Sequence, residues 1–165
     1  MRDLSFDVPA GQSVAMVGSN GAGKSTVLRL LLRLADPREG EVRIDDRDIR
    51  DVTVRSLRSR MSVVFQESVL FGLTLRENLS LGRPSSSDEA IYEVLERVRA
   101  DDLIRKLPDG LDTVVRRRGG HFSGGELQRL SIARAILADG DVWLLDEPTS
   151  GLDVESVDAH RFREL

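Results

Sequence analysis

Gly18-Ser19-Asn20-Gly21-Ala22-Gly23-Lys24-Ser25 is the most informative segment of this 165-residue chain. It fits the pattern of a glycine, any four residues, a second glycine, a lysine and a serine or threonine, which predicts a phosphate-binding loop. Such glycines let backbone N–H groups turn inward around the β- and γ-phosphates, and the following helix adds its dipole. We expect Lys24 to supply a positive charge, Ser25 to bind Mg²⁺ and Thr26 to contact the α-phosphate.

The sequence on both sides of this loop supports the interpretation. Val14 to Val17 is a continuous apolar run, which predicts a strand buried on both faces of a parallel sheet. Apolar residues from Val27 to Leu34 recur at helical spacing until Asp36-Pro37 ends the pattern. A strand before the loop and a helix after it disfavour the alternative of a glycine-rich turn that binds nothing.

The remaining pattern alternates strands with helices, which favours a parallel sheet flanked by helices. Further strands are predicted at residues 4–8, 42–44, 61–65 and 142–145. Ser86-Ser87-Asp88-Glu89 fits a capping box before one helix, and another helix is expected to open at Ser123 and run to Leu137. We therefore predict an α/β fold with a parallel core sheet, a partial antiparallel β subdomain and an inserted α-helical subdomain.

Asp146 and Glu147 follow the predicted strand at 142–145 directly. The carboxyl ends of parallel strands form the edge where α/β proteins bind ligands. Asp146 is suited to Mg²⁺, and Glu147 is suited to polarising a water for attack on a γ-phosphate. An Asp-Glu pair can instead simply cap a turn before Pro148, but the phosphate loop earlier in the chain favours the catalytic interpretation.

The composition excludes several classes of protein. The chain has no cysteine, which excludes disulfide scaffolds and thiol catalysis. With 24 basic and 28 acidic residues its formal charge is −4, which argues against duplex nucleic acid as the main ligand. The apolar runs are far shorter than the ~20 residues that cross a bilayer, and the first residues do not resemble a signal peptide.

Phe122-Ser123-Gly124-Gly125-Glu126 narrows the class further, because a serine and two glycines opening a helix predict a second anion-binding terminus. With this segment the chain resembles the nucleotide-binding domain of an ABC transporter, especially of the exporter type. The similar segments are the Walker A loop at 18–25, the Q-loop region at 63–78, the X-loop lead-in at 107–113, the signature at 122–126, the Walker B strand at 142–147 and the D-loop at 150–153.

The resemblance implies an ATPase that powers an exporter, with ATP and Mg²⁺ bound between two domains arranged head to tail. Ser123, Gly124 and Gly125 would then contact the nucleotide of the partner domain. Gln66 would contact Mg²⁺ and sense the transmembrane domain, and Glu147 would act on the attacking water. The implied partners are a second nucleotide-binding domain and a transmembrane domain, at the cytoplasmic face of the cell membrane. No nucleic acid partner is expected.

Some residues depart from the family pattern. Glu126 replaces the usual glutamine of the signature, and we expect a tolerated variant because it can cap its own helix. Arg116-Arg117 stand where exporters usually carry Gly-Glu. This reversal of charge puts standard coupling to the transmembrane domain in doubt; the alternative is that the two arginines simply form a solvated basic turn. His160 lies too close to Asp153 to be the family's switch histidine, and we expect His121 to be an exposed loop residue.

Along the chain we predict an ATP-binding core at 1–75, a helical subdomain at 76–122 and the signature helix with Walker B and the D-loop at 123–165. The adenine-stacking aromatic and the switch histidine of the family have no counterpart here. We therefore expect a fragment of a longer exporter subunit, with a gap at the sheet centre where the family has one more strand. The alternatives are an ATP-binding module without turnover and a soluble ABC ATPase of DNA repair or translation.

Overall fold

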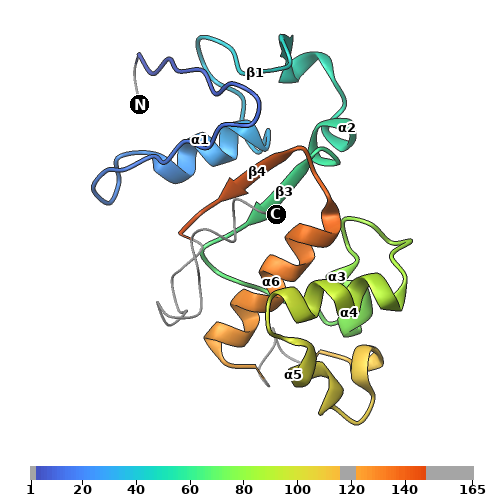
Figure 1. Cartoon of the computed structure of the whole chain (residues 1–165). Helices are drawn as coiled ribbons and strands as arrows, with labels where there is room; N and C mark the ends of the chain where they lie inside the picture. Colours follow the sequence, from blue (N-terminus) through green and yellow to red (C-terminus); the bar gives the residue numbers. More distant parts are fainter. Residues whose placement is uncertain (1–2, 116–121, 148–165) are drawn as a thin grey trace. The chain divides into compact units, whose positions relative to one another are not determined.

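The structure is a computed structural model that describes residues 3–115 and 122–147 (Figure 1). The described residues form two compact units, and the division lies between Leu57 and Arg58. Each unit is described by itself below. No helix within the described ranges is long and apolar enough to cross a membrane. The three-part division at residues 75 and 122 stays a prediction.

The first unit contains the phosphate loop, one helix and a small hairpin. Helix α1 (Lys24–Leu31) is followed by strands β1 (Arg43–Ile44) and β2 (Arg47–Asp48), which pair antiparallel. Asp45 and Asp46 join these strands with φ angles of 50° and 62°, which is the backbone of a tight hairpin turn. A 3-10 turn η1 (Ile49–Asp51) and helix α2 (Val54–Arg58) follow, and only the last residue of α2 belongs to the second unit. The buried apolar residues here are Val27, Leu32, Ile49 and Leu57.

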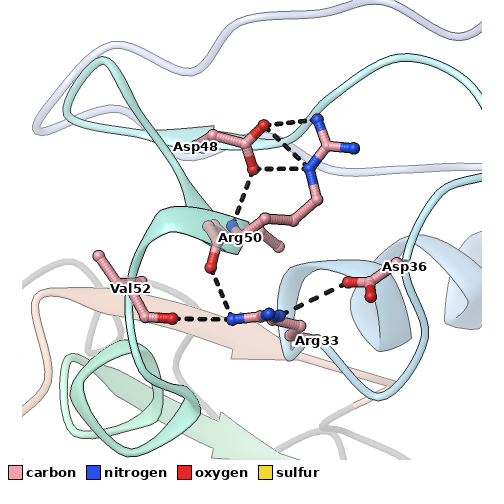
Figure 2. Close-up of polar contacts among 6 residues, drawn as sticks. Arg33, Asp36, Asp48, Arg50 and Val52 are labelled. Carbon is pink, nitrogen blue, oxygen red and sulfur yellow. Dashed lines mark hydrogen bonds and ion pairs between the residues drawn. The ribbon is translucent and has the colours of Figure 1, made fainter.

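Arg33 connects the end of α1 to the segment after the hairpin (Figure 2). Its Nη1 donates to the carbonyl of Ile49 at 3.1 Å and to that of Val52 at 2.8 Å. Its Nε lies 3.5 Å from a carboxylate oxygen of Asp36. One side chain therefore donates to two backbone carbonyls of the segment after the hairpin.

A second polar link joins Asp48, the last residue of β2, to Arg50 in the 3-10 turn η1 (Figure 2). Arg50 Nη2 donates to Asp48 Oδ2 at 2.6 Å, and Arg50 Nε lies 3.0 Å from the same oxygen. The backbone N–H of Arg50 also donates to Asp48 Oδ1, at 2.8 Å. These hydrogen bonds, the side-chain bonds of Arg50 first, lower the pKa of Asp48 to about 2.

Two strands predicted in the first unit do not form. Residues 4–8 and Val14 to Val17 have no ladder partner among the described residues. The Val17 side chain is 94% exposed and that of Val14 55%, so the expected burial on both faces is also wrong. An apolar run supplies side chains suited to a strand, but a ladder also needs a neighbouring strand to receive its N–H and C=O groups. In this unit the only ladder of the described residues pairs β1 with β2.

The second unit contains a parallel strand pair beside the longest helix. Strand β3 (Met61–Val64) pairs with β4 (Val142–Leu145), with Met61 opposite Val142 and Val64 opposite Leu145. Both strands were predicted from their apolar runs, and both predictions are confirmed. Helix α6 (Gly124–Ala138) packs against this pair through Ile132 and Ala135, which form a buried cluster with Val64.

Short helices form the rest of the second unit (Figure 1). They are α3 (Leu75–Leu79), α4 (Asp88–Arg97), α5 (Asp101–Arg105) and the 3-10 turn η2 (Gly110–Asp112). Their apolar faces meet α6 in the main core, which includes the fully buried residues Leu75, Leu79, Ile91, Leu95, Ile104 and Leu130. The helix predicted behind Ser86 is therefore confirmed as α4, and the one after Ser123 as α6.

The predicted start of α4 is wrong by one residue. Ser87, and not Ser86, is the N-cap, and its hydroxyl accepts from the N–H of Ala90 at 3.3 Å. The Ser86 hydroxyl instead donates to the carbonyl of Arg83 at 2.8 Å. Consecutive serines offer two equivalent caps to a pattern search, and the turn that precedes the helix uses the first of them.

Candidate nucleotide site

The phosphate loop closes on itself through Lys24. Its Nζ donates to the carbonyl of Gly18 at 2.9 Å and lies 3.4 Å from that of Ser19. The N–H of Ala22 donates to the Ser19 carbonyl at 3.1 Å. Gly21 has a φ of 83° and Gly23 a φ of 102°, a region that residues with a side chain rarely adopt. The loop pattern therefore requires glycine at these two positions for its backbone path.

Helix α1 begins at Lys24, so it includes the last two residues of this loop. The N–H of Thr26 donates to the Gly23 carbonyl at 3.0 Å, and Gly23 provides no side-chain cap. The first turn of α1 contains no acidic residue, so no carboxylate of that turn neutralises the positive end of its dipole. Ser25 is exposed in this turn. A helix start of this kind favours an anion.

The second unit places Gln66 and Glu147 together. In the β3–β4 ladder each residue lies opposite the residue 81 positions later, from Met61 and Val142 to Val64 and Leu145. Gln66 and Glu147 are also 81 positions apart in the sequence, and each lies two residues beyond the last pair of the ladder. The register of the strands therefore places the two residues opposite each other at the carboxyl edge. Gln66 Nε2 donates to Glu147 Oε2 at 2.8 Å. The N–H of Asp146 donates to the Val64 carbonyl at 2.9 Å, which extends the ladder toward this edge.

The residue types at this edge suit a hard cation. Gln66 donates to Glu147 through its amide nitrogen. The other polar atom of the same amide is an oxygen, which is the type of ligand that a magnesium ion prefers. Asp146 and Glu147 add carboxylate oxygens. No group of three or more His, Cys, Asp or Glu side chains close enough for a metal occurs in ranges 3–115 and 122–147. Mg²⁺ commonly takes only one or two carboxylates from the protein and its other ligands from phosphates and water, so this sparse donor set fits that ion.

Ser123 begins helix α6 with a complete capping box. The backbone N–H of Ser123 donates to Glu126 Oε2 at 2.7 Å, and that of Glu126 donates to Ser123 Oγ at 3.3 Å. The predicted cap of this helix by Glu126 is confirmed. The bonds from the backbone of Ser123, then from its side chain, lower the pKa of Glu126. Gly124 and Gly125 form the first residues of α6.

Two polar residues of α6 were not recognised from the sequence. Gln128 is 1% exposed and accepts a hydrogen bond from the Ser68 hydroxyl. Arg134 Nη1 donates to the carbonyl of Val69 at 3.1 Å, and burial lowers the pKa of this guanidinium. Both contacts tie α6 to the segment that follows Gln66. Their only sequence signal is a polar residue among the apolar positions of the helix, which does not reveal a partner 60 or more residues away.

Several sequence predictions fall outside the described residues. They concern Arg116-Arg117, His121, the D-loop at 150–153 and His160. The phosphate loop lies in the first unit, whereas Gln66, Asp146, Glu147 and the Ser123 cap lie in the second.

A phosphate loop before a helix, a parallel strand pair with carboxylates at its edge and a serine-glycine helix start define the class of P-loop nucleotide-binding proteins. Comparison with known proteins is consistent with this class. The family model described as "ABC transporter" matches residues 1–150. The chain therefore belongs to the ABC transporter family, and the resemblance stated from its motifs is confirmed.

The similar proteins are of the exporter type. The chain is 48% identical over 153 residues to the mitochondrial iron-sulfur clusters transporter atm1 of Aspergillus fumigatus. The matched residues make up 93% of this chain and 21% of that protein. It is 47% identical over 154 residues to the beta-(1-->2)glucan export ATP-binding/permease protein NdvA of Bartonella bacilliformis. Here the matched residues make up 93% of this chain and 26% of that protein.

A solved structure of a bacterial Atm1-family ABC exporter with ATP bound matches with a TM-score of 0.87 and 45% identity, over 93% of this chain and 27% of that one. This match confirms the α/β fold class. The chain spans about a quarter of the length of these relatives.

Proposed function

We propose that this chain binds Mg-ATP and hydrolyses it as the nucleotide-binding domain of an exporter. The observation that carries the proposal is the Gln66–Glu147 hydrogen bond of 2.8 Å at the carboxyl edge of the parallel strands. It pairs a metal-binding type of side chain with a candidate base in a chain that also has a phosphate loop. The similarity to an exporter with ATP bound supports the same nucleotide.

The proposed chemistry is mainly electrostatic and positional. Residues 18–26 would surround the phosphates with N–H groups, and Lys24 would stabilise each phosphate charge ~4 Å away by about 4 kcal/mol in a partly wet site. Ser25, Asp146 and Gln66 would hold Mg²⁺, which neutralises phosphate charge when bound. Glu147 would accept a hydrogen bond from the attacking water and orient it toward the γ-phosphorus.

Ser123, Gly124 and Gly125 would serve the nucleotide of a partner domain. A Cβ atom placed on Gly124 would meet no atom within 4 Å, so packing within the described residues does not require a glycine there. Glycine lowers helix stability by about 1 kcal/mol relative to alanine. Close approach of a molecule outside this chain, such as the phosphates of a nucleotide on a second domain, gives a reason for a glycine at this position.

The remaining partner would be a transmembrane domain. The similar exporters are named as transporters or permeases, and this chain corresponds to about a quarter of their length. This similarity supports the proposal that the chain lies at the cytoplasmic face of the cell membrane, attached through that partner. The transported substrate would be chosen by the transmembrane domain and not by the residues described here.

The proposal is tested by measuring Mg-ATP binding calorimetrically and phosphate release in parallel. Lys24→Ala should weaken binding by at least about tenfold, because it removes the charge nearest the phosphates. Lys106, the other lysine of the chain, is exposed at the end of α5, and Lys106→Ala is the matched control. Glu147→Gln should retain binding and slow phosphate release by about 10²- to 10⁴-fold.

Two results would redirect the proposal. Binding by the unmodified chain without phosphate release would support the alternative of an ATP-binding module without turnover. Equal effects of Lys24→Ala and Lys106→Ala would contradict the phosphate loop as the nucleotide site.

A further inference from the structure

The Ser123 hydroxyl is already engaged within its own chain. Its oxygen donates to Glu126 Oε2 at 2.8 Å and accepts from the Glu126 N–H at 3.3 Å. A serine hydroxyl has a single proton to donate, and an ionised carboxylate can only accept. The proton that Ser123 would offer to a phosphate oxygen of a partner's nucleotide is therefore directed at Glu126.

Glutamate and glutamine differ at this position in two ways. A glutamine can accept the Ser123 N–H with its amide oxygen and donate to Ser123 Oγ with its NH₂ group, which leaves the hydroxyl proton for another acceptor. A glutamate instead takes that proton and adds a negative charge. The bonds from Ser123 lower the pKa of Glu126, so it carries this charge at neutral pH. A charge of this sign repels an approaching phosphate.

We propose that Glu126 is a positioning residue that restrains the contact between Ser123 and the partner's nucleotide, by holding the hydroxyl proton and by placing a negative charge beside it. This inference rests on the proposed function, because it assumes an ATP-dependent dimer. Its consequence is a dimer that needs more Mg-ATP than the same chain with glutamine at position 126.

The chain contains its own control for the structural role of such a box. Thr74 and Glu77 form the same arrangement at the start of α3, with Thr74 Oγ1 donating to Glu77 Oε2 at 2.8 Å and the Thr74 N–H donating to the same oxygen at 2.8 Å. The pKa of Glu77 is also lowered, by the bonds from Thr74. No nucleotide contact is proposed at this second box. Glu77→Gln therefore reports what the amide does to a cap alone.

The test measures dimer formation against Mg-ATP concentration by light scattering, in chains that carry Glu147→Gln so that turnover does not deplete the nucleotide. Adding Glu126→Gln should lower the Mg-ATP concentration for half-maximal dimerisation by about tenfold. Adding Glu77→Gln should leave it unchanged. Thermal unfolding should show a similar, small decrease in Tm for both variants, because each loses a charged capping residue near a helix N-terminus.

A double-mutant cycle with Ser123→Gly separates the proton effect from general repulsion. Glycine still serves as an N-cap, so α6 remains formed while the hydroxyl is removed. The gain from Glu126→Gln should fall to about threefold or less in this background, because only the charge effect remains. An equal gain with and without the hydroxyl would overturn the role of Ser123. A loss of dimer, or the same gain from Glu77→Gln, would overturn the proposal itself.

The test distinguishes this inference from the proposed function. If the chain with Glu147→Gln alone dimerises in Mg-ATP and Glu126→Gln brings no gain, only the role of Glu126 is wrong. If no variant dimerises at saturating Mg-ATP, the proposed nucleotide-sandwich dimer is wrong and the inference fails with it.

Discussion

Val14 to Val17 and Val142 to Leu145 are apolar runs of the same length in the two units, yet only the second is a strand. Every residue of the second run lies opposite a residue of β3, and Leu144 is 6% exposed. The first run has no ladder partner among the described residues, and Val17 is 94% exposed. The difference shows that an apolar run specifies a surface to be covered, whereas a neighbouring strand decides whether a ladder forms.

The largest expected difference between the units concerns a buried leucine. Leu144→Ala should lower the free energy of unfolding by about 2–5 kcal/mol, because it removes contacts in the packed strand pair and leaves a cavity. The check is urea unfolding followed by the fluorescence of Trp143, the one tryptophan of the chain. Leu34 is 57% exposed, and Leu34→Ala should change stability by less than about 0.5 kcal/mol. Similar losses from both variants would contradict the comparison.

The second effect concerns the close approach of Gly140, which lies between α6 and β4, to the backbone of β3. A Cβ atom on Gly140 would lie 2.6 Å from the backbone carbon of Met61 and 2.7 Å from the backbone nitrogen of Ser62. Gly140→Ala should therefore cost about 1–3 kcal/mol, because backbone must move to admit the methyl group. A Cβ on Gly72 would meet its nearest atom at 3.9 Å, so Gly72→Ala is the matched control. Equal stability of the two variants in urea unfolding would show that Gly140 lies farther from the backbone of β3.

A smaller effect is expected in the first unit. Val17→Thr should change the melting temperature little, corresponding to less than about 0.5 kcal/mol, because the side chain it alters is exposed. Amide hydrogen exchange adds a direct reading: the N–H groups of 14–17 should exchange much faster than those of 142–145. Protection of both runs, together with a cost above 1 kcal/mol for Val17→Thr, would show that a ladder forms at Val14 to Val17 after all.

The smallest expected effect is on the titration of Asp48. It tests whether local polar contacts contribute to the stability of the first unit. Its pKa of about 2 lies below the ordinary value of 3.8. The stability gained from its carboxylate is therefore fully present above pH 3.8 and is lost as the pH falls through about 2. In an NMR titration Arg50→Ala should return this pKa toward its ordinary value, whereas Arg47→Ala should leave it low. Equal shifts would contradict the side-chain pair as the cause.

The sequence predicts most of the second unit because its signals are local and agree with one another. The strands at 61–64 and 142–145 follow from apolar runs, and α6 follows from a cap at Ser123 and regular apolar spacing. The same kind of signal failed at Val14 to Val17, where the missing information is the identity of a neighbour. At α4 it failed by one residue, because Ser86 and Ser87 are equivalent to a capping pattern.

The candidate site was predictable as a set of residue types but not as an arrangement. Gln66 and Glu147 could each be named from a motif, whereas their contact depends on a register between strands 81 positions apart. The links from Gln128 and Arg134 to the segment after Gln66 depend in the same way on how α6 packs. The engagement of Ser123 by Glu126 is local, and the three-residue spacing alone was sufficient to predict it.

Glu147 adopts a φ of 48°, in the left-handed region that residues with a Cβ atom rarely occupy. This backbone is less favourable by roughly 1–2 kcal/mol for a glutamate, whereas a glycine adopts it without that penalty. Random variation screened only for heat resistance should therefore enrich glycine at position 147. If Glu147 acts on the attacking water as proposed, a screen that also demands ATP turnover should restore the glutamate. The φ angle at position 147 would then lower stability while serving activity.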